Sequence, residues 1–189
     1  MLARPKGGRI LETFTEPKEF VENARYEDER REALAALVPA SIDEPIVDMI
    51  SGFATLGHCF TLQCCYGHFI CRSEQDSYTL ESIPRGWDGP VRYRIAYIAF
   101  CMQNSDRGRM FRQALARIPE TAPDYVQFGS ADWFWDQWPN TYVLQAMPIA
   151  DRLKDETILD SLEALQTQEA RGLFFVKLGE LLAAELRQH

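Results

Sequence analysis

Apolar residues recur at helical spacing near both ends of the chain. Residues 17–38 are rich in helix-forming side chains. A second helix is predicted to run to Gly57 from Ser41 or Asp43, whose side chains can cap its free amides. Near the C-terminus the pattern predicts a helix over 154–187. Its apolar positions are Ile158, Leu162, Leu165, Leu173, Phe174, Leu178, Leu181 and Leu182. A stripe of this length must cover a sheet or another subunit.

The spacing changes to alternation over residues 58–64, which predicts a strand. One face of this strand holds three apolar side chains, those of Phe60, Leu62 and Cys64. Residues 65–68 supply a turn, in which Gly67 can adopt the positive φ that tight turns often need. The chain then returns through 69–72, so the segment is predicted to be a β-hairpin.

The strongest strand pattern covers residues 91–102, whose second half is apolar on both faces and therefore belongs in the interior of a sheet. Residues 104–106 cap a following helix, and further strands are predicted at 125–128 and 141–147. The sum is an α+β fold: N-terminal helices, a β-hairpin and mixed sheet with one inserted helix, and a long C-terminal helix. A length of 189 residues suits one domain over 1–189.

Charge and cysteine content narrow the expected surroundings. The net charge is −8, so the average field repels phosphate backbones and acidic membrane surfaces, and nucleic acid is a doubtful partner. No apolar run reaches the roughly 18 residues that cross a bilayer, and the N-terminus has no apolar core of signal-peptide length. A cytoplasmic location and no membrane association are expected. The five cysteines are expected to be free thiols, because an odd number cannot all pair within the chain.

Residues 58–71 hold six side chains of the kinds that bind zinc, namely His58, Cys59, Cys64, Cys65, His68 and Cys71. Their spacing argues against a metal site, because a strand sends Cys64 and Cys65 to opposite faces. No metal is therefore expected. Cys65 is the better candidate for a nucleophile, since it leaves the strand at the turn, three residues before His68. The alternative is that both residues are structural.

A second candidate site is the aromatic stretch FGSADWFWDQWPNTY, residues 128–142. Aromatic faces can stack on a nucleobase or on the adenine of a cofactor, and Ser130 or Asp132 can add polar specificity. The alternative is core packing, because Trp133 and Trp135 alternate with Phe134.

Residues 60–68, FTLQCCYGH, resemble a motif of the tRNA wybutosine-synthesis methyltransferase family, Phe/Tyr-Thr-Thr-Ser-Ser-Cys-Ser-Gly-Arg. Phe60, Thr61, Cys65 and Gly67 match it, whereas His68 stands at the position of its arginine. The predicted order of elements over 91–148 also resembles that family, so the resemblance covers residues 41–148.

The resemblance implies a similar fold and a pocket for S-adenosylmethionine near the turn. Methyl transfer from a sulfonium chiefly requires two reactants held in line. The residues implied as catalytic are Cys65, His68 and Asp132. Those implied for the cofactor are Thr61, Tyr66, Gly67, Ser130, Trp133 and Trp135. Arg92 and Arg94 are candidates for contacts with the substrate.

Two interpretations remain open from the sequence. The first is an enzyme, or a former enzyme, that binds a small nucleotide-like ligand between the turn and the aromatic stretch. The second is a non-catalytic interaction protein that forms a homodimer through its C-terminal helix. An enzyme requires Cys65, His68, Asp132 and the Arg92 and Arg94 side chains to converge on one pocket, whereas an interaction protein does not.

Overall fold

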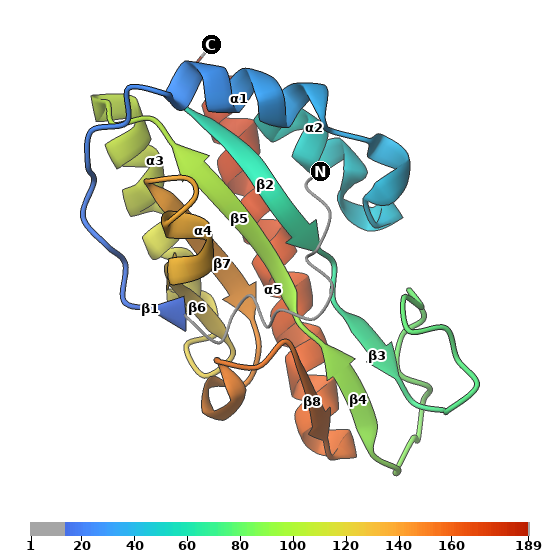
Figure 1. Cartoon of the computed structure of the whole chain (residues 1–189). Helices are drawn as coiled ribbons and strands as arrows, with labels where there is room; N and C mark the ends of the chain where they lie inside the picture. Colours follow the sequence, from blue (N-terminus) through green and yellow to red (C-terminus); the bar gives the residue numbers. More distant parts are fainter. Residues whose placement is uncertain (1–13, 189) are drawn as a thin grey trace.

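A computed structural model of the chain describes residues 14–188 (Figure 1). Those residues form five α-helices and two antiparallel sheets, so the α+β class with a long C-terminal helix is confirmed. Within residues 14–188 no helix is both long and apolar enough to cross a membrane. The N-terminal stretch on which the expectation of no signal peptide rests, residues 1–13, lies outside the described residues.

The larger sheet has the strand order β1-β6-β7-β5-β2. Its strands are β1 (Phe14–Thr15), β2 (Cys59–Cys65), β5 (Ala96–Met102), β6 (Val126–Ala131) and β7 (Thr141–Ala146). β5 lies in the interior and is buried along its whole length, as its pattern predicted. Ile98 and Phe100 face one core, whereas Tyr97 and Ala99 face a second core on the opposite side. In Figure 1, α5 runs behind this sheet and α4 lies in front of it.

The smaller sheet has the order β3-β4-β8 and consists of β3 (His68–Ile70), β4 (Val91–Arg94) and β8 (Glu156–Leu159). The predicted β-hairpin is wrong, because β2 pairs with β5 and β3 pairs with β4. The chain therefore bends at residues 66–67 but keeps its direction, and the predicted strand 91–102 is likewise divided at Ile95. β2 and β3 run beside β5 and β4 as one antiparallel ribbon that belongs to both sheets.

Gly67 has the positive φ that the sequence indicated, 89°, although it serves a bend rather than a reversal. A Cβ atom at this position would lie 2.8 Å from the Cβ of Ala96 on the neighbouring ribbon segment. Glycine is therefore required here both by backbone conformation and by the close approach of the second segment.

A β-bulge in β2 changes which cysteine enters the core. The pairing with β5 shifts between Thr61 and Gln63, so one extra residue is accommodated there. As a result Cys65, rather than the predicted Cys64, joins Phe60 and Leu62 in one core, and Cys64 packs against the opposite core. Alternation in the sequence assumes a regular strand. It therefore could not predict that the extra residue of the bulge turns Cys65, rather than Cys64, toward this core.

The helices are α1 (Tyr26–Ala35), α2 (Val47–Ala54), α3 (Asp106–Ala116), α4 (Asp132–Trp135) and α5 (Ser161–Leu186). Short 3-10 turns occupy η2 (Pro39–Ser41), η3 (Glu44–Ile46), η4 (Ile118–Thr121) and η5 (Ile149–Asp151). The predicted cap of α3 is confirmed, since the Ser105 side chain accepts a hydrogen bond from the Gly108 amide.

The first predicted helix, 17–38, is too long at its start. Residues 17–25 are not helical, because side chains of the larger sheet bind their backbone. Asn140 both accepts from the Val21 amide and donates to the Val21 carbonyl, each at 2.9 Å. Tyr142 donates to the Lys18 carbonyl at 2.8 Å. Long-range partners therefore replace the bonds within a helix.

The C-terminal helix begins at Ser161 rather than at 154, because residues 156–159 pair with β4 as β8. Asp160 caps α5 by accepting from the Glu163 amide at 2.9 Å. The buried stripe of α5 contains small and polar side chains as well as apolar ones: Ala164, Thr167, Ala170, Arg171, Phe174, Phe175, Leu178 and Leu182. Several predicted apolar positions instead face solvent, namely Ile158, Leu162, Leu165 and Leu173.

Candidate functional site

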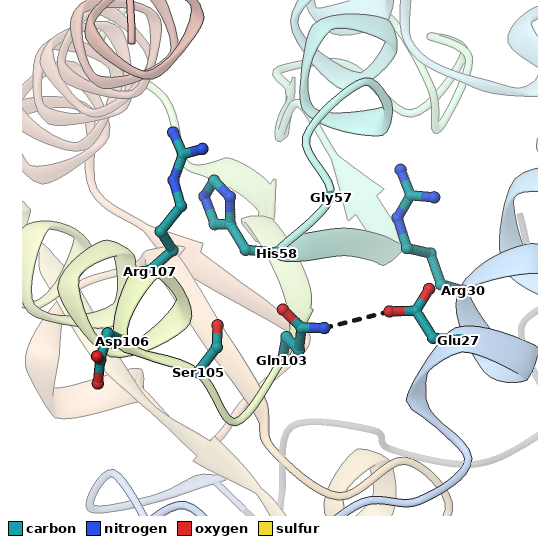
Figure 2. A pocket seen from close by; sticks show the side chains of 8 residues that line it. All are labelled: Glu27, Arg30, Gly57, His58, Gln103, Ser105, Asp106 and Arg107. Carbon is teal, nitrogen blue, oxygen red and sulfur yellow. Dashed lines mark hydrogen bonds between the residues drawn. The ribbon is translucent and has the colours of Figure 1, made fainter. Parts of the chain in front are cut away.

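A hollow of about 540 Å³ opens at one end of the larger sheet (Figure 2). It lies where β2 and α3 begin and where β5 ends, and it is called the α3 hollow below. Its lining residues are Glu27, Arg30, Gly57, His58, Gln103, Ser105, Asp106 and Arg107. Most of them are polar or charged, so the α3 hollow offers several groups that can form hydrogen bonds with a ligand.

Side chains of both charges line the α3 hollow. Arg107 is 42% exposed, and its guanidinium lies 3.8 Å from the Glu185 carboxylate. The same carboxylate lies 3.4 Å from Nε2 of the buried His58. On the other side Glu27 accepts a hydrogen bond from Gln103 at 3.1 Å, as Figure 2 shows. Arg30 is held by the carbonyl groups that end α2.

The start of α3 contributes backbone as well as side chains to this hollow. A Cβ atom at Gly108 would lie 2.0 Å from the Gln103 carbonyl oxygen, so a glycine lets the chain turn sharply from β5 into α3. The N-terminal end of a helix carries a partial positive charge. The α3 hollow therefore carries both charges on each side, with Asp106 beside Arg107 at the start of α3 and Arg30 beside Glu27 on α1.

The opposite end of β2 carries a second constellation, which we call the Asp43 cluster: Asp43, Cys65 and His68. One oxygen, sulfur and nitrogen atom from these residues lie within 4.8 Å of one another. The Asp43 carboxylate accepts a hydrogen bond from the Tyr66 amide at 2.7 Å. The Tyr66 amide, in the turn beside which the cofactor pocket was expected, thus already binds a carboxylate of the chain itself.

His68 is the most enclosed member of the Asp43 cluster, with 1% of its surface exposed. Its Nδ1 lies 3.0 Å from the Thr79 carbonyl oxygen, and its Nε2 lies 3.5 Å from the Asp43 carboxylate. Burial lowers the pKa of His68, but the nearby Asp43 carboxylate and Cys65 thiol outweigh burial and raise that pKa to about 10. Burial acts to raise the pKa of Asp43, yet His68 and the Tyr66 amide hold it below its usual value.

Two arginines lie beside this cluster. Arg171 of α5 is buried, lies over the Tyr66 ring at 4.2 Å and donates to the Gly67 carbonyl at 2.9 Å. Arg94 in β4 lies opposite His68 in β3, and its guanidinium donates a hydrogen bond to the Ser77 carbonyl at 3.3 Å. Asp43 and Arg171 were not among the site residues predicted from the sequence. Arg171 could have been found, because a charged residue on the buried stripe of a helix needs a specific partner.

The structure brings five of the predicted site residues together at the end of β2: Cys65, Tyr66, Gly67, His68 and Arg94. Thr61 lies at the bulge in the middle of β2, away from this cluster. Arg92 is two residues from Arg94 in β4 and forms an ion pair with Glu156 at 3.8 Å.

The aromatic stretch lies at the opposite corner of the larger sheet. The row that starts at Cys65 continues through Tyr97 and Gln145 to Gln127, four positions before β6 ends at Ala131. Strands β5 and β7 also separate β6 from β2, which adds roughly 14 Å across the sheet. Among the residues that the structure describes, the turn and the aromatic stretch are therefore too far apart to line one shared cavity.

Side chains of the aromatic stretch instead hold the N-terminal segment. Asp132 forms an ion pair with Lys18 at 2.6 Å, and the Lys18 ammonium lies 5.4 Å from the centre of the Trp135 ring. The buried Ser130 hydroxyl accepts from the Lys18 amide at 3.1 Å. Trp133 packs against the core and contacts Phe134 edge-on. These contacts show that Ser130, Asp132, Trp133 and Trp135 stabilise the fold.

The cysteines agree with the expectation of free thiols, since all five are unpaired with one another. Burial raises the pKa of Cys64 to about 12, and burial also raises the pKa of Cys59 and Cys101 well above the usual value. These three thiols therefore behave as small apolar side chains at neutral pH.

Comparisons with known proteins give a likeness to solved structures but no match to a family or a curated protein. No protein-family model and no curated protein matches the chain. The fold is similar to the structure of the PH1069 protein from Pyrococcus horikoshii, with 12% sequence identity and a TM-score of 0.48. The match covers 94% of this chain and 98% of that one. At this level the likeness says nothing about function.

Proposed function

We propose that the chain binds a small nucleotide-like ligand of the S-adenosylmethionine type in the α3 hollow. The observation that carries the proposal is a hollow lined by groups of both charges, with Arg107 on one side and Glu27 on the other. Its volume of about 540 Å³ falls within the range of small-molecule sites.

The chemistry of such a ligand suits this arrangement. The amino-acid part of S-adenosylmethionine carries a carboxylate and an ammonium group. The Arg107 guanidinium can bind the carboxylate, and Glu27 can bind the ammonium group, through charge-assisted hydrogen bonds. His58 and Gln103 add polar groups that can contact ribose or base.

The α3 hollow lies at the start of β2, whereas the sequence motif predicted the ligand at the end of that strand. The resemblance to the wybutosine methyltransferases centres on β2, and the α3 hollow includes Gly57 and His58 just before that strand. The turn at the other end of β2, where the ligand was expected, has its Tyr66 amide and Gly67 carbonyl occupied by Asp43 and Arg171. The hollow is the more open of the two places.

Isothermal titration calorimetry with S-adenosylmethionine, S-adenosylhomocysteine and ATP tests the proposal. We expect binding of at least one of them, and Arg107→Ala should weaken it by about tenfold through loss of one charge-assisted contact. Arg117→Ala is the matched control, because Arg117 is exposed at the far end of the same helix. Absence of binding by all three ligands, or equal affinity in the two variants, would contradict the proposal.

A second candidate function is self-association through α5. Its outer face exposes four apolar side chains at helical spacing, Leu162, Leu165, Leu173 and Val176, with exposed fractions from 41% to 66%. A second copy of the same helix would cover this stripe with side chains of the same kind.

Light scattering after size-exclusion chromatography tests self-association. The wild-type chain is expected to have the mass of a dimer and Leu173→Glu the mass of a monomer. Met110→Glu is the control, because Met110 is also exposed and apolar but lies on α3. A monomeric wild type would exclude this function.

A further inference from the structure

We propose that Asp43, Cys65 and His68 form a binding site for one divalent transition-metal ion of the zinc class. This site lies at the opposite end of β2 from the α3 hollow and does not depend on the ligand proposed there. The sequence predicted no metal, because it placed Cys64 and Cys65 on a regular strand and gave no sign of Asp43.

The ligand atoms already lie close together. The carboxylate oxygen, the thiol sulfur and the imidazole nitrogen are within 4.8 Å of one another, and within residues 14–188 no other set of three such groups comes this close. A tetrahedral zinc ion holds its ligand atoms about 3.3 to 3.8 Å apart, as its bond lengths require. A contraction of up to about 1.5 Å would therefore bring these three groups to the spacing of zinc ligands.

The orientation of His68 is the second argument. Its Nδ1 lies 3.0 Å from the Thr79 carbonyl oxygen, which can only accept a hydrogen bond, so Nδ1 carries a hydrogen. This leaves Nε2 as the coordinating nitrogen, and a hydrogen bond from Nδ1 to a carbonyl is the usual way in which proteins orient a metal-binding histidine.

Nε2 of His68 is buried and has no hydrogen-bond partner among the described residues, and it lies 3.5 Å from the Asp43 carboxylate. An imidazole lone pair that faces a carboxylate oxygen in a buried place is unfavourable. A positive charge must lie between them, either as a proton on Nε2 or as a metal ion. The Cys65 sulfur, within 4.8 Å of both groups, supplies a third ligand atom for a metal ion.

The set of donor atoms selects the class of metal. One sulfur, one nitrogen and one oxygen suit zinc, cobalt and similar ions, whereas magnesium and calcium require oxygen ligands throughout. A thiolate and a carboxylate would also balance the charge of a divalent ion. Binding would release the thiol proton of Cys65 and the proton on Nε2 of His68 to solvent.

The local fold explains how these residues meet. The bulge between Thr61 and Gln63 sets the face on which Cys65 lies, and the bend at Gly67 carries the chain on to His68. Two residues then separate Cys65 from His68, which is a common spacing for a pair of ligands. The nearby Arg94 and Arg171 donate to the carbonyls of Ser77 and Gly67 rather than to Asp43.

Cobalt titration of the full chain, after removal of metals with a chelator, tests the site. We expect a thiolate-to-cobalt charge-transfer absorption that saturates at one ion per chain and disappears when zinc is added. Cys65→Ser should abolish this absorption and weaken zinc binding by more than about 100-fold. Removal of a residue that only hydrogen-bonds to a metal ligand costs about 10-fold to 100-fold, so a larger loss identifies Cys65 as a ligand itself. Cys64→Ser is the matched control, because Cys64 is the adjacent thiol on the opposite face of β2.

Circular dichroism shows whether each variant folds. If Cys65→Ser does not fold, the cobalt titration of the wild type is still a test. A folded wild type without the charge-transfer absorption overturns the proposal. Retention of the absorption in Cys65→Ser, or its loss in a folded Cys64→Ser, would also overturn it. Zinc should raise the melting temperature of the wild type, since an ion that binds only the native state stabilises it.

Discussion

The two ends of β2 each place a buried histidine beside a carboxylate, at similar distances. His58 lies 3.4 Å from Glu185, and His68 lies 3.5 Å from Asp43. At the first end Arg107 shares the carboxylate and the residues open into the α3 hollow. At the second end a carbonyl fixes the ring and a thiol lies beside it. The same two functional groups, an imidazole and a carboxylate, thus line an open hollow at one end and an enclosed cluster at the other.

The largest difference between the two ends is expected for glycine substitutions. Gly67→Ala should lower the free energy of unfolding by about 3 kcal/mol, because it combines a positive φ with a Cβ that meets Ala96. Gly57→Ala, at the hollow end, should change the free energy by less than about 0.5 kcal/mol, since its Cβ would meet nothing within 4 Å. Urea unfolding measures both, and equal effects would show that the bend tolerates a side chain.

Tyrosine hydroxyls give the next comparison. Tyr93 is fully buried, donates to the Ala146 carbonyl at 2.7 Å and accepts from the Ala96 amide at 3.1 Å. Tyr93→Phe leaves both backbone groups unpaired and should cost about 2 kcal/mol. Tyr26→Phe loses one bond, to the Gly57 carbonyl at the hollow end, and should cost about 1 kcal/mol. Thermal unfolding of the two variants checks the order, and the reverse order would contradict it.

Removing the carboxylate charge at each end compares the two histidine pairs directly. Asp43→Asn should cost about 1.5 kcal/mol, because Asp43 both faces an enclosed imidazole and accepts from the Tyr66 amide. Glu185→Gln should cost less than about 1 kcal/mol, since the contacts of Glu185 with His58 and Arg107, at 3.4 and 3.8 Å, are weaker than the 2.7 Å hydrogen bond from the Tyr66 amide to Asp43. Urea unfolding at neutral pH measures both values, with a larger loss for Glu185→Gln as the contradicting result.

The smallest effect is the coupling between the two ends. They are separated by the seven residues of β2, or roughly 20 Å. The double variant Asp43→Asn with Glu185→Gln should therefore lose the sum of the two single losses within about 0.5 kcal/mol. A larger deviation in urea unfolding would show that β2 transmits changes from one end to the other.

Local patterns predicted those elements whose residues are stabilised by neighbours in sequence or by simple burial. The fully apolar second half of 91–102 indicated an interior strand, and Ser105 indicated the start of α3. The prediction of a helix over 17–25 was wrong because the backbone groups of this segment bind residues more than 100 positions away instead of one another. The hydrogen bonds between Asn140 and Val21 are an example. Helix propensity is a weak preference that such tertiary contacts override.

The candidate site was predictable in part. Alternation and Gly67 located the end of β2, and Cys65 and His68 do lie together there. The role of Asp43 was not visible, because it reaches the turn from a segment more than 20 residues earlier. The distance of the aromatic stretch from the turn depends on strand order, and the sequence alone does not give that order.

The ribbon formed by β2 and β3 with β5 and β4 has a consequence for how the molecule opens. Two chain segments cross from one sheet to the other side by side, and the Tyr93 hydroxyl fastens them to β7 where they cross. We therefore expect the smaller sheet to unfold together with the larger one rather than by itself. The Asp43 cluster, at the bend between the sheets, thus belongs to the cooperative unit of folding rather than to a frayed edge.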